Sequence, residues 1–399
     1  MATPHLLAAL TMGFALGLAR GDPLDNWHLR GTNAVLATDD LQAVTWGNGT
    51  FVAVGSSAGR TLAFVSTNGI GWRGRLADGD GTLTCVTWGT GGFVAAGYKL
   101  GLSQIATIQN GGLDGINWFE YGLFPSDELH AITSGYNRYV AVGFDSATLN
   151  GLAIVSSNGI TWTRHNLAES GISDSGVLLG ITFANDRFVA VSFSPGNSYT
   201  SPDGVTWTRH ELVPGMPRSI IFAMNHFVVA GGPQIFAGGA NVVTSADLEM
   251  WGWHSAGGPN YNPAIAFGSG VVLTVGNVYG TLAYSRNLND WTTRSLGSSY
   301  ALTGVAYGNS TFVIVGGTNI LQSDSLAPAF MSVPLRTANG MAITITGEPE
   351  RPYRLQAAAN LPADNWTDVI SFTNTVATTN FLDTAATNFS QRFYRVMSP

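Results

Sequence analysis

LHAITSGYNRYVAVGFDSATLNGLAIVSSNGITWTRH, residues 129–165, is one complete unit of a repeat that decides the fold. Four strand-like runs cover Leu129–Thr133, Tyr139–Gly143, Leu152–Ser156 and Thr161–His165. Short turns rich in Asn and Gly follow the first and third runs, and such turns are typical of β-hairpins. The stretch therefore predicts a small antiparallel sheet of four strands.

The same unit recurs along most of the chain. The second-strand phrase FVAVG at Phe51–Gly55 returns in related form at 93–97, 139–143, 188–192, 227–231, 272–276 and 312–316. Tryptophans mark the repeat at intervals of 40 to 46 residues: Trp27, Trp72, Trp118, Trp162, Trp207, Trp251 and Trp291. A period of about 40–45 residues with four strands per unit is typical of a β-propeller. We therefore predict an all-β chain with a seven-bladed β-propeller over residues 22–326.

The ends of the repeat predict how the ring closes. The seventh unit ends at Gln322–Ser325 without a tryptophan, whereas Trp27 precedes the first unit. We expect the segment around Trp27 to supply the outer strand of the last blade. Such a strand leaves no open seam between the first and last blades.

The turn before the fourth strand has its own signature. It reads STNG at 66–69, SSNG at 156–159 and SPDG at 201–204, each with a tryptophan three residues after the glycine. The phrase S-x-[DN]-G-x-x-W resembles a shortened Asp-box (BNR) repeat of the sialidase-like propeller superfamily, and the resemblance covers roughly residues 22–326. It implies the fold and no particular activity, because Asp boxes lie at the periphery and occur in many non-enzymes.

The resemblance does not extend to sialidase catalysis. Sialidases need three converging arginines, a Tyr/Glu pair and an Asp acid. Here the arginines recur after the repeat tryptophan on expected outer strands: Arg30, Arg75, Arg164, Arg209 and Arg294. Only Arg60 and Arg218 fit the opposite, long-loop face. We therefore expect no hydrolysis of sialosides.

Composition and the N-terminus indicate an exported protein. The net charge of −7 and the pI near 5.4 argue against a nucleic-acid partner. Leu6–Leu18 is a short apolar run followed by small residues, which predicts a signal peptide over 1–19, although a buried first strand is the alternative. No run is long enough to span a bilayer. We expect a secreted monomer, extracellular, periplasmic or on the cell surface.

The single cysteine predicts packing rather than chemistry. The residues equivalent to Cys85 in the other units are all small: Ala43, Ala131, Gly180, Ser219, Ala264 and Gly304. We expect Cys85 to fill a tight site on a first strand. The scattered histidines have no zinc-ligand spacing, and no phosphate-binding glycine loop is present. We predict no metal and no cofactor.

Residues 327–399 depart from the repeat and predict a small β-sandwich. Strands are expected at Met341–Thr346, Tyr353–Ala357, Asp368–Phe372, Thr379–Leu382 and Phe393–Val396. The phrases YRLQ at 353–356 and RFYRV at 392–396 resemble a fibronectin-III-like C-terminal module of secreted bacterial proteins. That module's role is generally unassigned, so spacer, attachment and binding roles stay open.

Function is expected on the face that carries the longer connections, which include 76–81, 121–128, 144–151 and 166–176. Acidic and aromatic residues gather there, and our candidate binding residues are Asp78, Asp80, Tyr98, Lys99, Asp127, Glu128, Phe144, Asp145, Glu169, Asp174, Tyr199 and Tyr261. We expect a non-catalytic surface for a glycan or an extracellular protein. The alternatives are a glycan-active hydrolase or lyase that uses paired carboxylates, and plain solvated loops.

Overall fold

The computed structural model describes residues 22–397, except 32, 100–101, 109–117, 174, 195, 213–214, 233–241, 257–262, 277–279, 298–300, 327–329, 347–351, 361–364 and 374–377. The expected signal peptide therefore lies outside the described residues. Among those described, no helix is long and apolar enough to cross a membrane. The helical segments in the described part of the chain are three short 3-10 turns: η1 (Pro23–Asp25), η2 (Leu167–Ser170) and η3 (Thr384–Asn388).

The repeat forms four-stranded antiparallel sheets, seven of them within the described part of residues 22–326. In chain order, six of these sheets have the following strands: β2 (Asp39–Gly47), β3 (Thr50–Ser57), β4 (Arg60–Ser66) and β5 (Arg73–Asp80); β6 (Thr82–Gly89), β7 (Gly92–Lys99), β8 (Leu102–Ile108) and β9 (Trp118–Pro125); β10 (Asp127–Gly135), β11 (Arg138–Asp145), β12 (Gly151–Ser156) and β13 (Thr163–Asn166); β14 (Leu178–Ala184), β15 (Arg187–Ser192), β16 (Asn197–Ser201) and β17 (Thr208–Leu212); β18 (Met216–Ala223), β19 (His226–Gly232), β20 (Val242–Ser245) and β21 (Gly252–His254); β22 (Ala264–Gly268), β23 (Val271–Val275), β24 (Thr281–Ser285) and β25 (Thr292–Ser295).

The remaining sheet joins the two ends of the repeat. Its order is β1 (Trp27–Arg30), β28 (Asn319–Ser323), β27 (Thr311–Gly316) and β26 (Gly304–Gly308). Trp27 lies opposite Ser323 in an antiparallel pair, which confirms the predicted placement of this segment on the outer edge. Ion pairs fasten the segment to the preceding sheet, from Arg286 to Asp22 and from Arg294 to Asp25, both at 2.7 Å.

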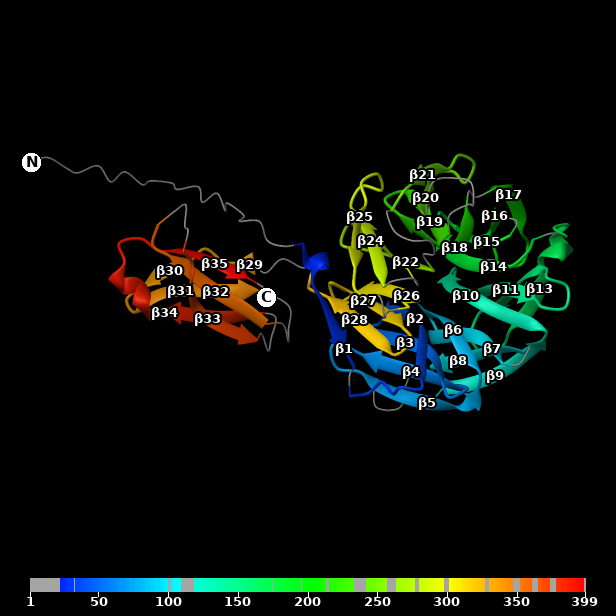
Figure 1. Ribbon diagram of the computed structural model, residues 1–399, viewed down its shortest axis with the longest axis horizontal. Coiled ribbons are helices and arrows are strands. Elements are labelled where there is room, and N and C mark those ends of the chain that lie inside the picture. Colours follow the sequence, from blue (N-terminus) through cyan, green and yellow to red (C-terminus); the bar gives the residue numbers. More distant parts are fainter. Residues whose placement is uncertain are drawn as a thin grey trace, which may run out of the picture.

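The first strands of the sheets form a closed circle. β2 contacts β6, the contacts continue through β10, β14, β18 and β22, and β26 contacts β2 again. Figure 1 shows these strands around a common centre, with the later strands of each sheet farther out. This arrangement is propeller-like, and it places one end of each first strand at the same end of a central channel.

Packing between sheets explains the repeated phrases. The side chains of Phe51–Val54 are fully buried because neighbouring sheets cover both faces of this second strand. Glycine at the end of a first strand makes room for an aromatic ring of the next sheet: a Cβ on Gly47 would overlap the Trp88 ring, and one on Gly308 would overlap Trp46. The second of these contacts closes the circle.

The turn before the fourth strand is held by its own side chains. Ser156 Oγ accepts from Gly159 N at 2.8 Å, Asn158 Oδ1 accepts from Ile160 N at 2.9 Å, and Trp162 Nε1 donates to the Gly159 carbonyl at 3.1 Å. The turn persists where the glycine is replaced. Leu248 and Leu288 adopt φ of 73° and 66°, and Leu248 N still donates to Ser245 Oγ at 2.8 Å.

The C-terminal residues form two further sheets. One contains β29 (Phe330–Met331), β30 (Leu335–Thr337), β31 (Gly340–Thr346) and β34 (Thr378–Asp383), and the other contains β32 (Pro352–Ala358), β33 (Thr367–Thr373) and β35 (Phe393–Met397). The five expected tail strands are all present. Ile343, Ile345 and Leu355 form an apolar cluster to which both sheets contribute.

Candidate functional site

A β-bulge at a constant place in five of the seven first strands builds the candidate site. The register shifts between Leu41 and Ala43, Leu83 and Cys85, Leu129 and Ala131, Leu178 and Gly180, and Pro217 and Ser219. The skipped residues are Gln42, Thr84, His130, Leu179 and Arg218. Bulges re-aim side chains out of the regular pleat. Here the skipped residues all line a cavity of about 170 Å³ at the centre of the circle.

The cavity has three layers, with one residue per sheet in each. We call the first layer the channel mouth: Gln42, Thr84, His130, Leu179, Arg218, Pro263 and Thr303. The second layer is the predicted set of small residues, including Cys85. The third layer is uniformly β-branched: Val44, Val86, Ile132, Ile181, Ile220, Ile265 and Val305. Since first strands begin at the connections between sheets, the mouth lies toward the face with the longer connections.

The bulge also explains the glycine of the FVAVG phrase. A Cβ on Gly143 would collide with the carbonyl oxygen of Glu128, and a Cβ on Gly55, Gly97 or Gly231 would meet the equivalent carbonyl of its own first strand. A Cβ on Gly316 would meet the carbonyl of Ala301, which precedes β26. The fourth unit differs and carries Ser192. A backbone that approaches this closely is a position where glycine is favoured. The repeated glycine therefore marks the bulge that shapes the mouth.

Aromatic rings surround one mouth residue, His130. Its imidazole stacks on Phe144 with ring centroids 5.7 Å apart and planes 6° apart, and Tyr98 lies 6.3 Å away. A carboxylate oxygen of Glu128 is 4.0 Å from His130 Nε2. These side chains come from two adjacent sheets, through β7, β10 and β11. They form a contiguous aromatic wall with one carboxylate at its edge.

A positive charge lies near this wall. The Arg218 guanidinium lies over the Phe193 ring, 5.2 Å from its centroid. Burial, together with the charge of Arg218, lowers the pKa of His130 to about 4. The imidazole is therefore neutral at neutral pH, where it can both donate and accept a hydrogen bond. The mouth combines a neutral imidazole, a guanidinium and aromatic faces.

Two other mouth residues join neighbouring sheets. Thr84 Oγ1 donates to the Leu129 carbonyl at 2.7 Å, and Thr303 Oγ1 donates to the Leu41 carbonyl at 2.9 Å. Gln42 Nε2 donates to Asp40 Oδ2 at 2.8 Å. The side of the mouth around His130 and Arg218 thus has the more varied chemistry for a ligand.

Several predicted binding residues lie near one another here. Tyr98, Glu128 and Phe144 surround His130, as described above. Lys99, next to Tyr98, pairs with the exposed Asp80 at 3.1 Å. The structure therefore brings part of the predicted set to the edge of the mouth.

Two of the predicted carboxylates serve the scaffold instead. Asp127 is fully buried and receives Arg164 Nε at 2.7 Å and Nη2 at 2.8 Å. Asp145 Oδ2 accepts from the same Nη2 at 3.2 Å. Arg164 lies on outer strand β13, where the repeat predicted a scaffold arginine. A buried carboxylate with such a partner is not available to a ligand.

The other predicted residues lie elsewhere. Tyr199 is fully buried in β16, and its hydroxyl donates to the Ser175 carbonyl at 3.0 Å, so its assignment to the binding face is wrong. Glu169 is exposed in η2, 3.9 Å from His165 Nδ1. Asp174, Tyr261 and the side chain of Asp78 lie outside the described residues.

Two expected connections are also corrected. Most of 76–81 belongs to β5, and most of 121–128 belongs to β9 and β10. Single residues, Gly81 and Ser126, separate these strands, and both adopt positive φ. The outer strands of the first two sheets therefore continue into the segments that the sequence predicts as loops.

His130 was missed as a site residue, although the sequence held a signal for it. The small residue and the β-branched residue that follows it keep their type in all seven units. The side chain at the position just before them differs between units: it is an amide, a hydroxyl, an imidazole, an aliphatic chain, a guanidinium or a proline ring. A position whose chemistry varies within an otherwise uniform repeat is free of the packing demands that fix its neighbours.

Groups of three or more His, Cys, Asp or Glu that could hold a metal ion do not occur among the described residues.

Comparison with known proteins supports the fold. No protein-family model matches the chain, and no curated protein matches it. The extracellular domain of BT4673 from B. thetaiotaomicron is similar with a TM-score of 0.56 and 9% identity, over 89% of this chain and 55% of that one. The computationally designed Ika8 protein gives 0.46 at 14% identity over 72% and 97%, and BamB from Moraxella catarrhalis gives 0.44 at 11% over 74% and 95%. At 9% identity, the likeness to the BT4673 domain concerns the fold alone.

Proposed function

We propose that this chain is a secreted, non-catalytic seven-bladed β-propeller that binds a glycan or an extracellular protein at its channel mouth. In this proposal, residues 1–19 are a signal peptide, 22–326 form the propeller, and 327–399 form a β-sandwich. The S-x-[DN]-G-x-x-W turns are a shortened Asp-box repeat. The chemistry of the channel mouth carries the proposal.

The wall formed by Tyr98, His130 and Phe144 favours a glycan. Sugar rings present C–H faces that pack on aromatic rings, while their hydroxyls need neutral donors and acceptors, and an imidazole with a pKa of about 4 offers both. Arg218 adds a donor that suits a carboxylate or a hydroxyl pair. Binding sites of this kind combine apolar walls with a few polar groups.

Hydrolysis requires more than this site offers among its described carboxylates. A glycosidase uses one carboxyl group as an acid and another as a base or nucleophile. Asp127 and Asp145 do converge, but on Arg164, which holds both charges. We therefore propose binding and not glycan cleavage.

A glycan array, together with a panel of extracellular proteins, tests the proposal with the purified chain. Phe144→Ala and Arg218→Gln should each lower the signal of the best ligand by roughly tenfold or more. The control is Arg138→Gln, because Arg138 is exposed at the opposite, hairpin-turn face and donates to the Asp203 carbonyl at 3.1 Å. A ligand that all three variants bind like the wild type would refute the channel mouth as the site.

A further inference from the structure

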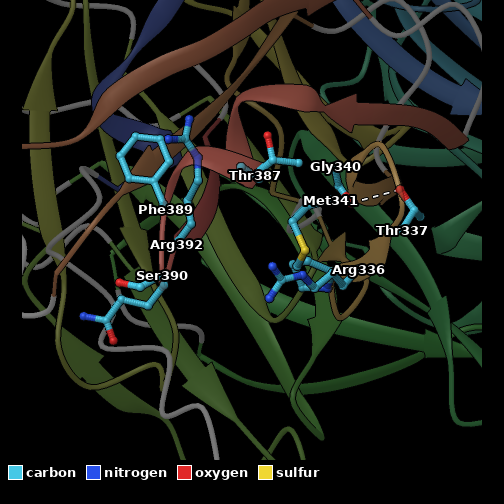
Figure 2. A pocket seen from close by; sticks show the side chains of 11 residues that line it. Arg336, Thr337, Gly340, Met341, Thr387, Phe389, Ser390 and Arg392 are labelled. Carbon is cyan, nitrogen blue, oxygen red and sulfur yellow. Dashed lines mark hydrogen bonds between the residues drawn. The ribbon is translucent and has the colours of Figure 1, made fainter.

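The C-terminal sheets carry a second cavity, of about 200 Å³. Figure 2 shows it between two groups of side chains. Arg336 and Met341 come from the β30–β31 hairpin, whereas Phe389, Ser390 and Arg392 come from the segment between η3 and β35. We call this cavity the module pocket. It is small, since pockets for drug-sized ligands are typically about 300–1,000 Å³, so it suits a single small group.

One wall of the module pocket contains Arg392, whose side chain is held by neighbouring residues. Arg392 Nε lies 2.7 Å from Asp383 Oδ2, and Asp383 is 5% exposed. The Tyr394 hydroxyl donates to the same carboxylate oxygen at 2.8 Å. The Arg392 guanidinium also lies over the Phe389 ring, 4.4 Å from its centroid. Because these contacts order the side chain in advance, a ligand loses little binding free energy in fixing it.

The opposite wall presents a second guanidinium. Arg336 is exposed, and no carboxylate pairs with it in the described part of the chain. Two arginines and a single buried carboxylate give the pocket a net positive charge, although the whole chain carries −7. Guanidinium groups bind carboxylate and sulfate with directed hydrogen bonds. The pocket therefore suits one anionic group.

The rest of the lining suits a sugar ring. Phe389 is 39% exposed, and Met341, from the other group of side chains, is partly buried, so both add apolar surface to the pocket. Ser390 and Gln391 supply neutral polar groups, with Gln391 Nε2 donating to Asn360 at 3.2 Å. A uronic acid unites the matching features, because it has one carboxylate, an apolar ring face and several hydroxyls.

We propose that the C-terminal module binds an acidic polysaccharide and seats one uronic-acid residue in the module pocket. The carboxylate pairs with the exposed Arg336, and the ring packs beside Phe389 and Arg392. This site is separate from the channel mouth, so the chain contacts its surroundings at two places. Attachment to an acidic polysaccharide would hold the propeller at a surface or in a matrix.

The test measures dissociation constants of the full chain for polygalacturonate, with neutral dextran and polyglutamate for comparison. Arg336→Gln and Phe389→Ala should each weaken polygalacturonate binding by roughly tenfold. Arg336→Gln is the primary variant because its side chain is exposed and the fold does not depend on it. Arg354→Gln is the matched control, since Arg354 is half-exposed on β32 of the same module and lies 4.0 Å from Asp368. That control should change binding less than twofold.

Three outcomes would overturn the proposal. Equal affinity for polyglutamate would show that the pocket recognises negative charge without recognising the sugar. Equal affinity for dextran would show that the carboxylate does not contribute to binding. Loss of polygalacturonate binding in Arg218→Gln but not in Arg336→Gln would place the ligand at the channel mouth. Thermal melts of every variant show that a loss of binding is not a loss of folding.

Discussion

At the scale of single residues, the bulge explains several features together. It turns His130 and Arg218 into the channel, and it pushes a first-strand carbonyl against the glycine of the FVAVG phrase. Small residues then follow because neighbouring first strands approach closely; a Cβ on Gly304 would lie 2.9 Å from the Cα of Ala43. Steric contact at the backbone, rather than catalysis, accounts for the uniformity of these positions.

Gly143→Ala tests this steric explanation. The added methyl group collides with the Glu128 carbonyl, so the strand must shift, and the free energy of unfolding should fall by about 1–3 kcal/mol. Gly71→Ala is the control, because a Cβ there meets nothing within 4 Å. Urea unfolding of both variants gives the comparison. Equal stabilities would mean that the bulge is not tightly packed.

Cys85 should be unreactive in the native state. Burial raises the pKa of its thiol to about 12, so the nucleophilic thiolate is scarce at pH 8, and the side chain is 7% exposed. The raised pKa stabilises the fold fully below the unfolded value of 9.0, and this contribution is lost as the pH rises towards 12. Rapid labelling by a bulky thiol reagent at pH 8 without denaturant would contradict the packing argument.

At the scale of elements, the sequence predicts the turns and strands directly, whereas the mouth leaves only one signal in it, the variable position before each small residue. The hydrogen bonds of the SSNG turn join residues that are two or three positions apart, so Ser156 and Asn158 predict the turn from the local sequence alone. The sequence assigns Tyr199 to the binding face because it does not show where a tyrosine hydroxyl points. In the structure that hydroxyl donates to the Ser175 carbonyl instead of facing water. The direction of the His130 side chain depends on the register between β10 and β11. The sequence of one strand alone does not determine that register.

At Leu248, backbone strain and side-chain burial have opposite effects on stability. Its φ of 73° is unfavourable for leucine by about 1–2 kcal/mol, which glycine would relieve. Its side chain is fully buried, and removing a buried leucine side chain costs about 2–5 kcal/mol. Leu248→Gly should therefore lower the free energy of unfolding, although glycine is the residue of the other turns. A more stable variant in urea unfolding would show that backbone strain outweighs burial here.

At the scale of the whole molecule, the N-terminal segment decides whether the circle is closed. The β1–β28 pair completes the last sheet, and Asp22 binds Arg286 and the Tyr284 hydroxyl on the sheet before it. Asp324 holds the same segment through Asn26 at 3.0 Å and His28 at 2.7 Å. The ends of the repeat are thus tied by backbone pairing and by charge.

Asp22→Asn should lower the melting temperature by a few degrees at pH 7. Burial alone would raise the pKa of Asp22, but the bonds from Arg286 and Leu24 outweigh it and lower that pKa below 3.8. The stabilisation is therefore present above pH 3.8 and is lost as the pH falls through the lower, folded-state value. The difference from wild type should disappear in strong acid. Glu169→Gln is the control, because that carboxylate is exposed.

The most direct test of the account is a crystal structure of the chain with the best ligand from the glycan array. We predict electron density for the ligand at the channel mouth, with a ring on the wall of Tyr98, His130 and Phe144 and a polar group beside Arg218. Density confined to the face of the S-x-[DN]-G-x-x-W turns, or found only in the module pocket, would contradict the assignment of the channel mouth as the propeller's binding site.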